Sequence, residues 1–265
     1  MGIRMIVSDL DGTIFKWGDP IPERTIGTIK QLTNAGKLFT LASGRMPRSL
    51  IPFAHRLGTN APLICYGGAL IYDPSTDSDL YHRSIPIQVS TRVLAEAKRR
   101  DLAVNVYQRD ALLIECLDES SPAYQSWMRS GAKAVGDLAG FLNPEPLHIS
   151  IVCDESRTYP LTEELVKEFA GEAHVSSGHP NMVEFNRIGV NKGSALCWLS
   201  AQTKIDRSQI LAIGNDLNDL EMLEWAGLSL AVSDSPPELL SVADEVVPAG
   251  VDVLSYAIER FDLAS

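Results

Sequence analysis

Two aspartates that directly follow an apolar strand are the feature that most constrains this chain. Residues 5–7 are apolar and typical of a strand covered on both faces, and Asp9 and Asp11 come after them. In an open parallel sheet the ligand crevice lies at the carboxyl ends of the strands. The pattern therefore predicts an α/β fold in which both carboxylates lie at that crevice.

The two carboxylates need a partner. Side chains at positions i and i+2 of an extended chain share one side of it, so their charges repel unless a cation or a shared proton relieves them. Mg2+ suits this place, because it prefers oxygen ligands and keeps positions open for a substrate phosphate. The alternative is a polar turn in which Gly12 supplies a positive φ and both aspartates are solvated.

The size and charge of the chain narrow its class. Its 265 residues exceed the usual domain of about 100 to 150 residues, so we expect two domains or a large insertion. A net charge of −11 argues against a nucleic-acid partner. The sequence has no apolar run near the roughly 20 residues that span a bilayer and begins with no basic and apolar leader, which predicts a cytoplasmic protein without a membrane partner. The sequence does not indicate an oligomeric state.

The four cysteines are far apart in the sequence and form no Cys-x-x-Cys pair. We expect Cys65, Cys116, Cys153 and Cys197 to be reduced thiols in the core rather than metal ligands.

Strands and helices alternate at both ends of the chain, which is typical of parallel β-α-β units. We predict that both ends build one parallel sheet. The expected elements are strands 3–8, 38–42, 62–66, 210–213 and 228–232 and helices 23–34, 47–57, 192–201, 217–226 and 252–261.

The middle of the chain has a different pattern. The polar turn 73–79 precedes shorter strands, expected at 112–117, 147–153 and 182–185, and two amphipathic helices, expected at 90–100 and 159–170. We therefore expect a discontinuous core domain of residues 1–83 and 187–265 and an inserted domain of residues 84–186.

Two further loops carry groups that suit a phosphate. Ser43-Gly44-Arg45 lies between a strand and a helix, where a hydroxyl and backbone N–H groups bind anions, and helix capping is the alternative for Ser43. Lys192 lies in the first turn of a predicted helix. A cation there is unfavourable unless an anion is near, so we expect a functional lysine, with a solvated one as the alternative.

A fourth loop, Gly214-Asn215-Asp216-Leu217-Asn218-Asp219, follows strand 210–213. Its oxygens can complete a metal shell begun by the first loop, and Asn218 can donate to phosphate. A capped helix start is the alternative, because Asp and Asn favour that position. Complementary chemistry in four loops favours one shared site.

Taken in order, these four loops resemble the motifs of the haloacid dehalogenase-like (HAD) superfamily, particularly its Cof-type hydrolases of subfamily IIB. The resemblance spans nearly the whole chain. It implies a Rossmann-like HAD core with a parallel sheet and an inserted α/β cap of type C2B that determines substrate specificity. It also implies a Mg2+-dependent phosphatase that hydrolyses a small phosphomonoester, such as a sugar phosphate or related metabolite, through an aspartyl phosphate.

The same resemblance implies a role for each loop. Asp9 would attack phosphorus, and Asp11 would give a proton to the leaving oxygen and later take one from water. The phosphoryl oxygens would be bound by Ser43, Gly44, Asn218 and the catalytic Lys192. Mg2+ would be bound by Asp9, the Asp11 carbonyl, Asn215 and Asp219.

Two positions depart from the family pattern. The fourth motif usually begins Gly-Asp, so Asn215 removes one formal charge from the metal shell. We predict Asn215, rather than Asp216, as the direct ligand, with Asp219 acting through water. Gly67 stands where the family usually has asparagine, near the cap hinge.

Candidates for substrate recognition come from the cap and the second loop. His179 and Asn181 precede the last cap strand, where a surface turn is the alternative, and Arg45 is expected to reach the phosphate or the cap. Two other functions use the same residues. One is a phosphomutase with the same intermediate, and the other is a non-catalytic sensor of phosphorylated metabolites, an idea that Asn215 supports.

Overall fold

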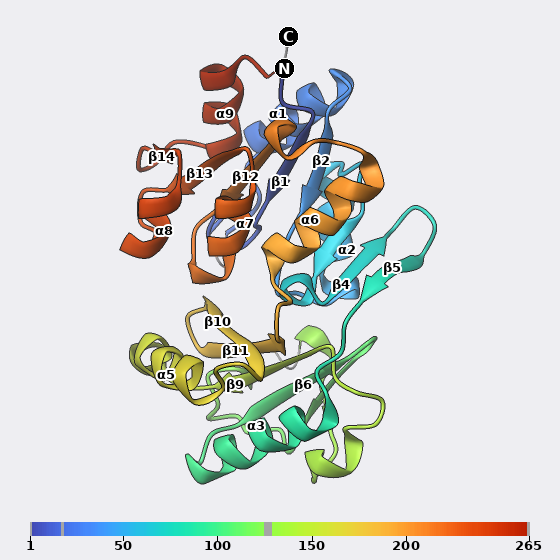
Figure 1. Ribbon diagram of the computed structural model, residues 1–265, viewed down its shortest axis with the longest axis vertical. Helices are drawn as coiled ribbons and strands as arrows, with labels where there is room; N and C mark the ends of the chain where they lie inside the picture. The colour runs from blue at the N-terminus through green and yellow to red at the C-terminus, as the bar shows by residue number, and fades with distance from the viewer. Residues whose placement is uncertain (1, 17–18, 125–128, 264–265) are drawn as a thin grey trace. The chain divides into compact units, whose positions relative to one another are not determined.

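The computed structural model describes residues 2–16, 19–124 and 129–263, and the chain separates into two compact units (Figure 1). Unit 1 consists of Met1–Leu80 and Asn191–Ser265, and unit 2 of Tyr81–Val190. Unit 2 therefore begins at residue 81 rather than 84 and ends at residue 190 rather than 186. Each unit has its own sheet and its own helices.

A five-stranded parallel sheet forms the centre of unit 1. Its order is β14-β13-β12-β1-β2, so β1 from the start of the chain lies between β2 and the late strand β12. Residues 5–7 are fully buried. The expected strand 62–66 lies instead in a separate small sheet, where it pairs antiparallel with the strand that follows it, and the prediction that both ends of the chain build one parallel sheet is otherwise confirmed. Its strands are β1 (Met5–Ser8), β2 (Leu38–Leu41), β12 (Ile210–Gly214), β13 (Leu228–Val232) and β14 (Glu245–Val247).

Helices cover both faces of this sheet (Figure 1). Helix α1 contacts α2 and α9, while α6 contacts α7. None of the helices in the described ranges is long and apolar enough to cross a bilayer. The helices of unit 1 are α1 (Glu23–Asn34), α2 (Pro47–Leu57), α6 (Lys192–Thr203), α7 (Leu220–Trp225), α8 (Pro237–Val242) and α9 (Val253–Phe261).

A turn of left-handed residues in a smaller sheet lies against the start of α6. The small sheet contains β3 (Leu63–Cys65), β4 (Leu70–Asp73) and β5 (Ser78–His82). Between β3 and β4, Gly67 has φ 59°, a conformation that asparagine also tolerates, so its departure from the family pattern preserves the backbone. A Cβ on Gly68 would lie 2.2 Å from the Asn191 carbonyl oxygen, so only glycine permits this close approach.

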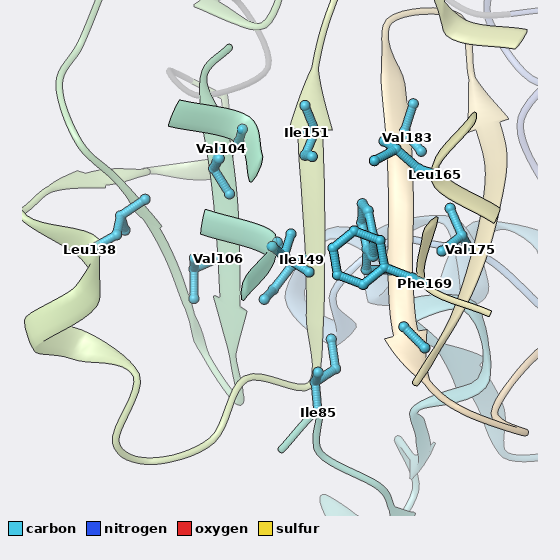
Figure 2. Close-up of a cluster of buried hydrophobic side chains, with 14 of the residues drawn as sticks. Ile85, Val104, Val106, Leu138, Ile149, Ile151, Leu165, Phe169, Val175 and Val183 are labelled. Carbon is cyan, nitrogen blue, oxygen red and sulfur yellow. The ribbon is translucent and has the colours of Figure 1, made fainter. Parts of the chain in front are cut away.

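Within the described residues, unit 2 contains a six-stranded sheet and the helices α3 and α5. Its order is β10-β11-β9-β6-β7-β8, and all pairs are antiparallel except β7 with β8. Its apolar core includes Ile149, Ile151 and Leu165 (Figure 2), and the rings of Phe169 and Phe185 meet edge to face at 5.2 Å. The elements are α3 (Ile87–Arg99), β6 (Val104–Gln108), β7 (Ala111–Ile114), β8 (Lys133–Ala134), β9 (His148–Val152), α5 (Glu155–Glu168), β10 (Ala173–His179) and β11 (Met182–Arg187).

Three expectations about local structure are wrong. The expected helix 217–226 is a 3₁₀ turn, Leu217–Asp219, followed by α7, because a capping box between Asp216 and Asp219 tightens its start. The expected strand 112–117 ends at Ile114, before a segment in which Cys116 is exposed. Cys197 is exposed as well, so only Cys65 and Cys153 are buried thiols.

Candidate active site

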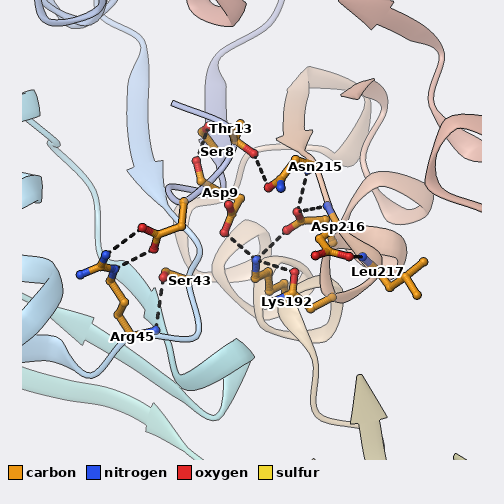
Figure 3. A network of polar contacts seen from close by, with 12 residues as sticks. Ser8, Asp9, Thr13, Ser43, Arg45, Lys192, Asn215, Asp216 and Leu217 are labelled. Carbon is orange, nitrogen blue, oxygen red and sulfur yellow. Dashed lines mark hydrogen bonds and ion pairs between the residues drawn. The ribbon is translucent and has the colours of Figure 1, made fainter. Parts of the chain in front are cut away.

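Asp9 lies at the carboxyl end of β1 and is 6% exposed. Its Oδ1 accepts a hydrogen bond from Lys192 Nζ at 2.7 Å (Figure 3). Burial raises the pKa of Asp9 to about 8, and the Lys192 ammonium opposes this rise. The ionised form of this carboxylate therefore depends on the cations beside it.

Lys192 is the first residue of α6 and is 1% exposed. Its Nζ also contacts Asp219 Oδ1 at 2.6 Å and Asn218 Oδ1 at 3.1 Å. Burial lowers the pKa of Lys192, but the attraction of Asp219 and Asp9 outweighs burial and holds that pKa above its usual range. The alternative of a solvated lysine is wrong, because this ammonium is enclosed by oxygen atoms.

Asp219 shapes the fourth loop and is fully buried. Its Oδ2 accepts backbone N–H groups of Asn215 at 2.9 Å and Asp216 at 3.3 Å, while Oδ1 faces Lys192. A Cβ on Gly214 would lie 2.5 Å from the Asp219 Cβ, so the loop requires glycine there. Asp216 Oδ1 accepts the Leu217 N–H at 2.7 Å and thereby caps the following turn.

The side-chain amide of Asn215 faces the first loop. The amide atom nearest to that loop lies 3.0 Å from the Asp11 carbonyl oxygen, 3.1 Å from Asp9 Oδ2 and 2.7 Å from Thr13 Oγ1. If this atom is nitrogen, it donates to the neighbouring oxygens. If it is oxygen, it accepts the Thr13 hydroxyl and lies beside the oxygens of Asp11 and Asp9, an arrangement that a bound cation would favour. A Cβ on Gly12, whose φ is +85°, would lie 2.4 Å from the Asn215 amide.

This oxygen set fits Mg2+. Adjacent oxygens of an octahedral Mg2+ site with bonds of about 2.1 Å lie about 3.0 Å apart, which is close to the separations at Asn215. Within the described ranges, no three His, Cys, Asp or Glu side chains are grouped to hold a metal ion. A site here would therefore combine one carboxylate, one backbone carbonyl and one amide.

Ser43 and Arg45 follow β2. Ser43 is 2% exposed, and its Oγ accepts the Arg45 N–H at 3.2 Å. The N-cap of α2 is Met46, with Pro47 in the first turn, so the alternative of Ser43 as a helix cap is wrong. Gly44, between Ser43 and Arg45, is half-buried.

Arg45 forms an ion pair that the sequence did not predict. Its Nε donates to Asp11 Oδ2 and its Nη2 to Asp11 Oδ1, both at 2.7 Å (Figure 3). The structure thus joins Arg45 to the predicted proton-transferring residue, and a contact of Arg45 with a phosphate or the cap stays a prediction.

His179 and Asn181 belong to unit 2. His179 ends β10, and its Nδ1 accepts the Asn181 N–H at 3.2 Å. The Asn181 carbonyl accepts the Cys153 N–H at 2.9 Å. Both residues therefore take part in the turn between β10 and β11, and their role in substrate recognition stays a prediction.

Comparison with known proteins gives the family that the chain matches and relatives that it resembles. A family model for haloacid dehalogenase-like hydrolases matches residues 6–252. The 5-amino-6-(5-phospho-D-ribitylamino)uracil phosphatase YitU of Bacillus subtilis is 27% identical over 272 residues, which cover 98% of each protein.

Two solved structures share the fold. A haloacid dehalogenase-like hydrolase from Bacteroides thetaiotaomicron has a TM-score of 0.80 at 25% identity, over 97% of this chain and 99% of that one. A sugar phosphatase of HAD subclass IIB has a TM-score of 0.84 at 17% identity, over 98% of this chain and 99% of that one. The latter similarity concerns the fold alone.

Proposed function

The chain belongs to the haloacid dehalogenase-like hydrolase family, and from this premise we propose that it is a Mg2+-dependent phosphatase for small phosphomonoesters. The observation that carries the proposal is the buried Lys192, which contacts Asp9, Asn218 and Asp219. A buried cation beside a carboxylate at the ends of parallel strands is suited to an incoming phosphoryl group.

In the proposed reaction the phosphoryl group passes through Asp9. A carboxylate oxygen of Asp9 attacks phosphorus, the bond from phosphorus to the substrate oxygen breaks, and Asp11 gives that oxygen a proton. Water then attacks the same phosphorus atom while Asp11 takes up its proton, and the Asp9 carboxylate leaves. Lys192, together with Ser43 and Asn218, holds the phosphoryl oxygens during both displacements.

Asp9, the Asp11 carbonyl and Asn215 would hold Mg2+. The ion would reduce the repulsion between the anionic nucleophile and the anionic phosphate. Asp219 would act mainly by orienting Lys192 and the backbone of its own loop, because both of its oxygens accept hydrogen bonds there.

The proposed substrate is a phosphorylated sugar or a related small metabolite. The name of the Bacillus subtilis relative describes a substrate with a phosphorylated ribityl group. Unit 2 would act as the cap that determines specificity, with His179 and Asn181 among the residues that contact the substrate. We also propose that the protein acts in the cytoplasm.

A phosphatase panel with and without a chelator tests the proposal. We expect phosphate release from p-nitrophenyl phosphate and from at least one sugar phosphate, loss of this activity in excess EDTA, and recovery when Mg2+ is added. Inorganic phosphate and isomerised sugar phosphate are measured in the same samples. Sugar phosphate isomerisation without phosphate release would favour a phosphomutase, and tight binding without turnover would favour a sensor. Undiminished turnover after chelation would exclude the metal requirement.

The variant Asn215→Asp tests the metal ligand. A carboxylate in place of the amide adds one negative charge to the oxygen set, so we expect half-maximal activation at an about tenfold lower Mg2+ concentration. Thermal stabilisation by Mg2+, measured without substrate, should shift in the same direction. Asp216→Asn is the matched control, because Asp216 caps a turn and is expected to leave the Mg2+ dependence unchanged. An equal shift in both variants would contradict the assignment.

A further inference from the structure

The ion pair between Arg45 and Asp11 takes no part in the bond-forming and bond-breaking steps of the proposed reaction. Two nitrogens of one guanidinium donate to the two oxygens of one carboxylate, each at 2.7 Å. Both side chains are largely enclosed, at 22% exposure for Arg45 and 17% for Asp11. A two-point contact of this kind fixes the plane of the carboxylate as well as its position.

Arg45 is itself held by a stack of aromatic rings. Its guanidinium carbon lies 4.8 Å from the centroid of the Phe53 ring, on α2. The Phe53 ring stacks on that of Phe15 at 5.5 Å, with 10° between the ring planes. The stack limits the positions open to the guanidinium.

The backbone of the first loop links Asp11 to Phe15, the outer ring of the stack. The Gly12 N–H donates to the Phe15 carbonyl at 2.9 Å, and Asp11 and Phe15 form a backbone bridge. The loop that carries Asp11 therefore also carries the ring at the far end of the stack. The chain of contacts from Asp11 through Arg45 and Phe53 returns to that loop at Phe15.

We infer that Arg45 is a positioning residue that holds the Asp11 carboxyl group in the orientation needed for proton transfer. This inference rests on the proposed phosphatase function, in which Asp11 gives its proton to the leaving oxygen as the bond to phosphorus breaks. Arg45 takes no part in the exchange of atoms. An arginine that served only to bind phosphate would not need Nε and Nη2 on a carboxylate or a ring beneath it.

The test compares two leaving groups in Arg45→Met. The p-nitrophenolate ion leaves without a proton, whereas the alkoxide of a sugar phosphate needs one. The value of kcat/KM is measured with p-nitrophenyl phosphate and with whichever of glucose 6-phosphate, ribose 5-phosphate and glycerol 3-phosphate the wild type hydrolyses fastest. We expect a loss of about 100-fold with the sugar phosphate, typical of losing a positioned general acid, and little change with p-nitrophenyl phosphate.

Two variants serve as matched comparisons. Arg48→Met makes the same substitution at an exposed position in the first turn of α2, and both substrates should be hydrolysed as by the wild type. Arg45→Lys keeps the charge but cannot form the two-point contact, so we expect it to recover only part of the sugar phosphate activity.

Each other outcome has a defined meaning. Equal losses with both substrates and a raised KM would make Arg45 a phosphate-binding residue and overturn the inference, as would an unchanged Arg45→Met protein. If Arg45→Met does not fold, Phe53→Leu is the variant to test, because it removes the ring that stacks on Arg45. The ratio of kcat/KM for the sugar phosphate to kcat/KM for p-nitrophenyl phosphate is then compared with that of the wild type. An unchanged ratio would overturn the inference. A wild type inactive on both substrates would reject the proposed function itself.

Discussion

Asp9→Asn is expected to yield a folded protein that releases no measurable phosphate. An amide of the same shape cannot form the aspartyl phosphate, and loss of a covalent nucleophile lowers turnover by about 10⁵-fold or more. The fold should tolerate the change, because Lys192 keeps its ion pair with Asp219 at 2.6 Å. Phosphate release with p-nitrophenyl phosphate and the unfolding midpoint of the same preparation are the two measurements.

The control for this variant is Asp19→Asn. Asp19 is exposed on the segment that follows the first loop, so the same substitution there should change neither activity nor stability. Turnover by Asp9→Asn within tenfold of the wild type would exclude the covalent route. A low unfolding midpoint for Asp9→Asn would instead identify a folding defect as the cause of lost activity.

Lys192→Met should lose both activity and stability. The variant leaves Asp9 and Asp219 buried without their shared cation, and removing one partner of a buried ion pair costs about 3 to 5 kcal/mol. Without the ammonium, burial raises the pKa of Asp9 in the folded state above its value in the unfolded chain. Stability is then lost as the pH rises, so the defect should shrink when unfolding is measured at pH 5 instead of pH 8.

A second substitution separates these two effects. Lys192→Met combined with Asp219→Asn removes one of the two unpaired charges, so part of the lost unfolding free energy should return. Activity should not return, since no cation would face the phosphoryl group. Recovered turnover in the double variant would show that Lys192 only balances Asp219. Unchanged stability in Lys192→Met would contradict the buried ion pairs.

The sequence predicted the loops of the site because each is a short pattern at the end of a strand. Asp9, Ser43 and residues 215–219 follow β1, β2 and β12, and parallel strands bring such ends together. Lys192 was recognisable from its unfavourable place at a helix start. These are local signals, and the common direction of the strands brings the loops together at one edge of the sheet.

The pair of Arg45 and Asp11 was not predictable in the same way. It joins residues 34 positions apart and depends on the side-chain orientation after two neighbouring strands, which no local pattern specifies. Three of the strands that the sequence did not predict have a related cause. β14 has three residues, β8 has two, and β10 reads Ala-His-Val-Ser-Ser-Gly-His, in which polar side chains obscure the alternation.

The place of β1 between β2 and β12 has a consequence for synthesis of the chain. Asp9 and Lys192 are 183 residues apart, so at about 5 to 20 residues per second Asp9 leaves the ribosome about 10 to 40 s before Lys192. During that interval β12 has not been synthesised, so the edge of β1 that pairs with β12 in the folded protein is open to other strands. The strands of unit 2 are all translated before β12, so we expect the inserted unit to fold first and the five-stranded sheet of unit 1 to form last.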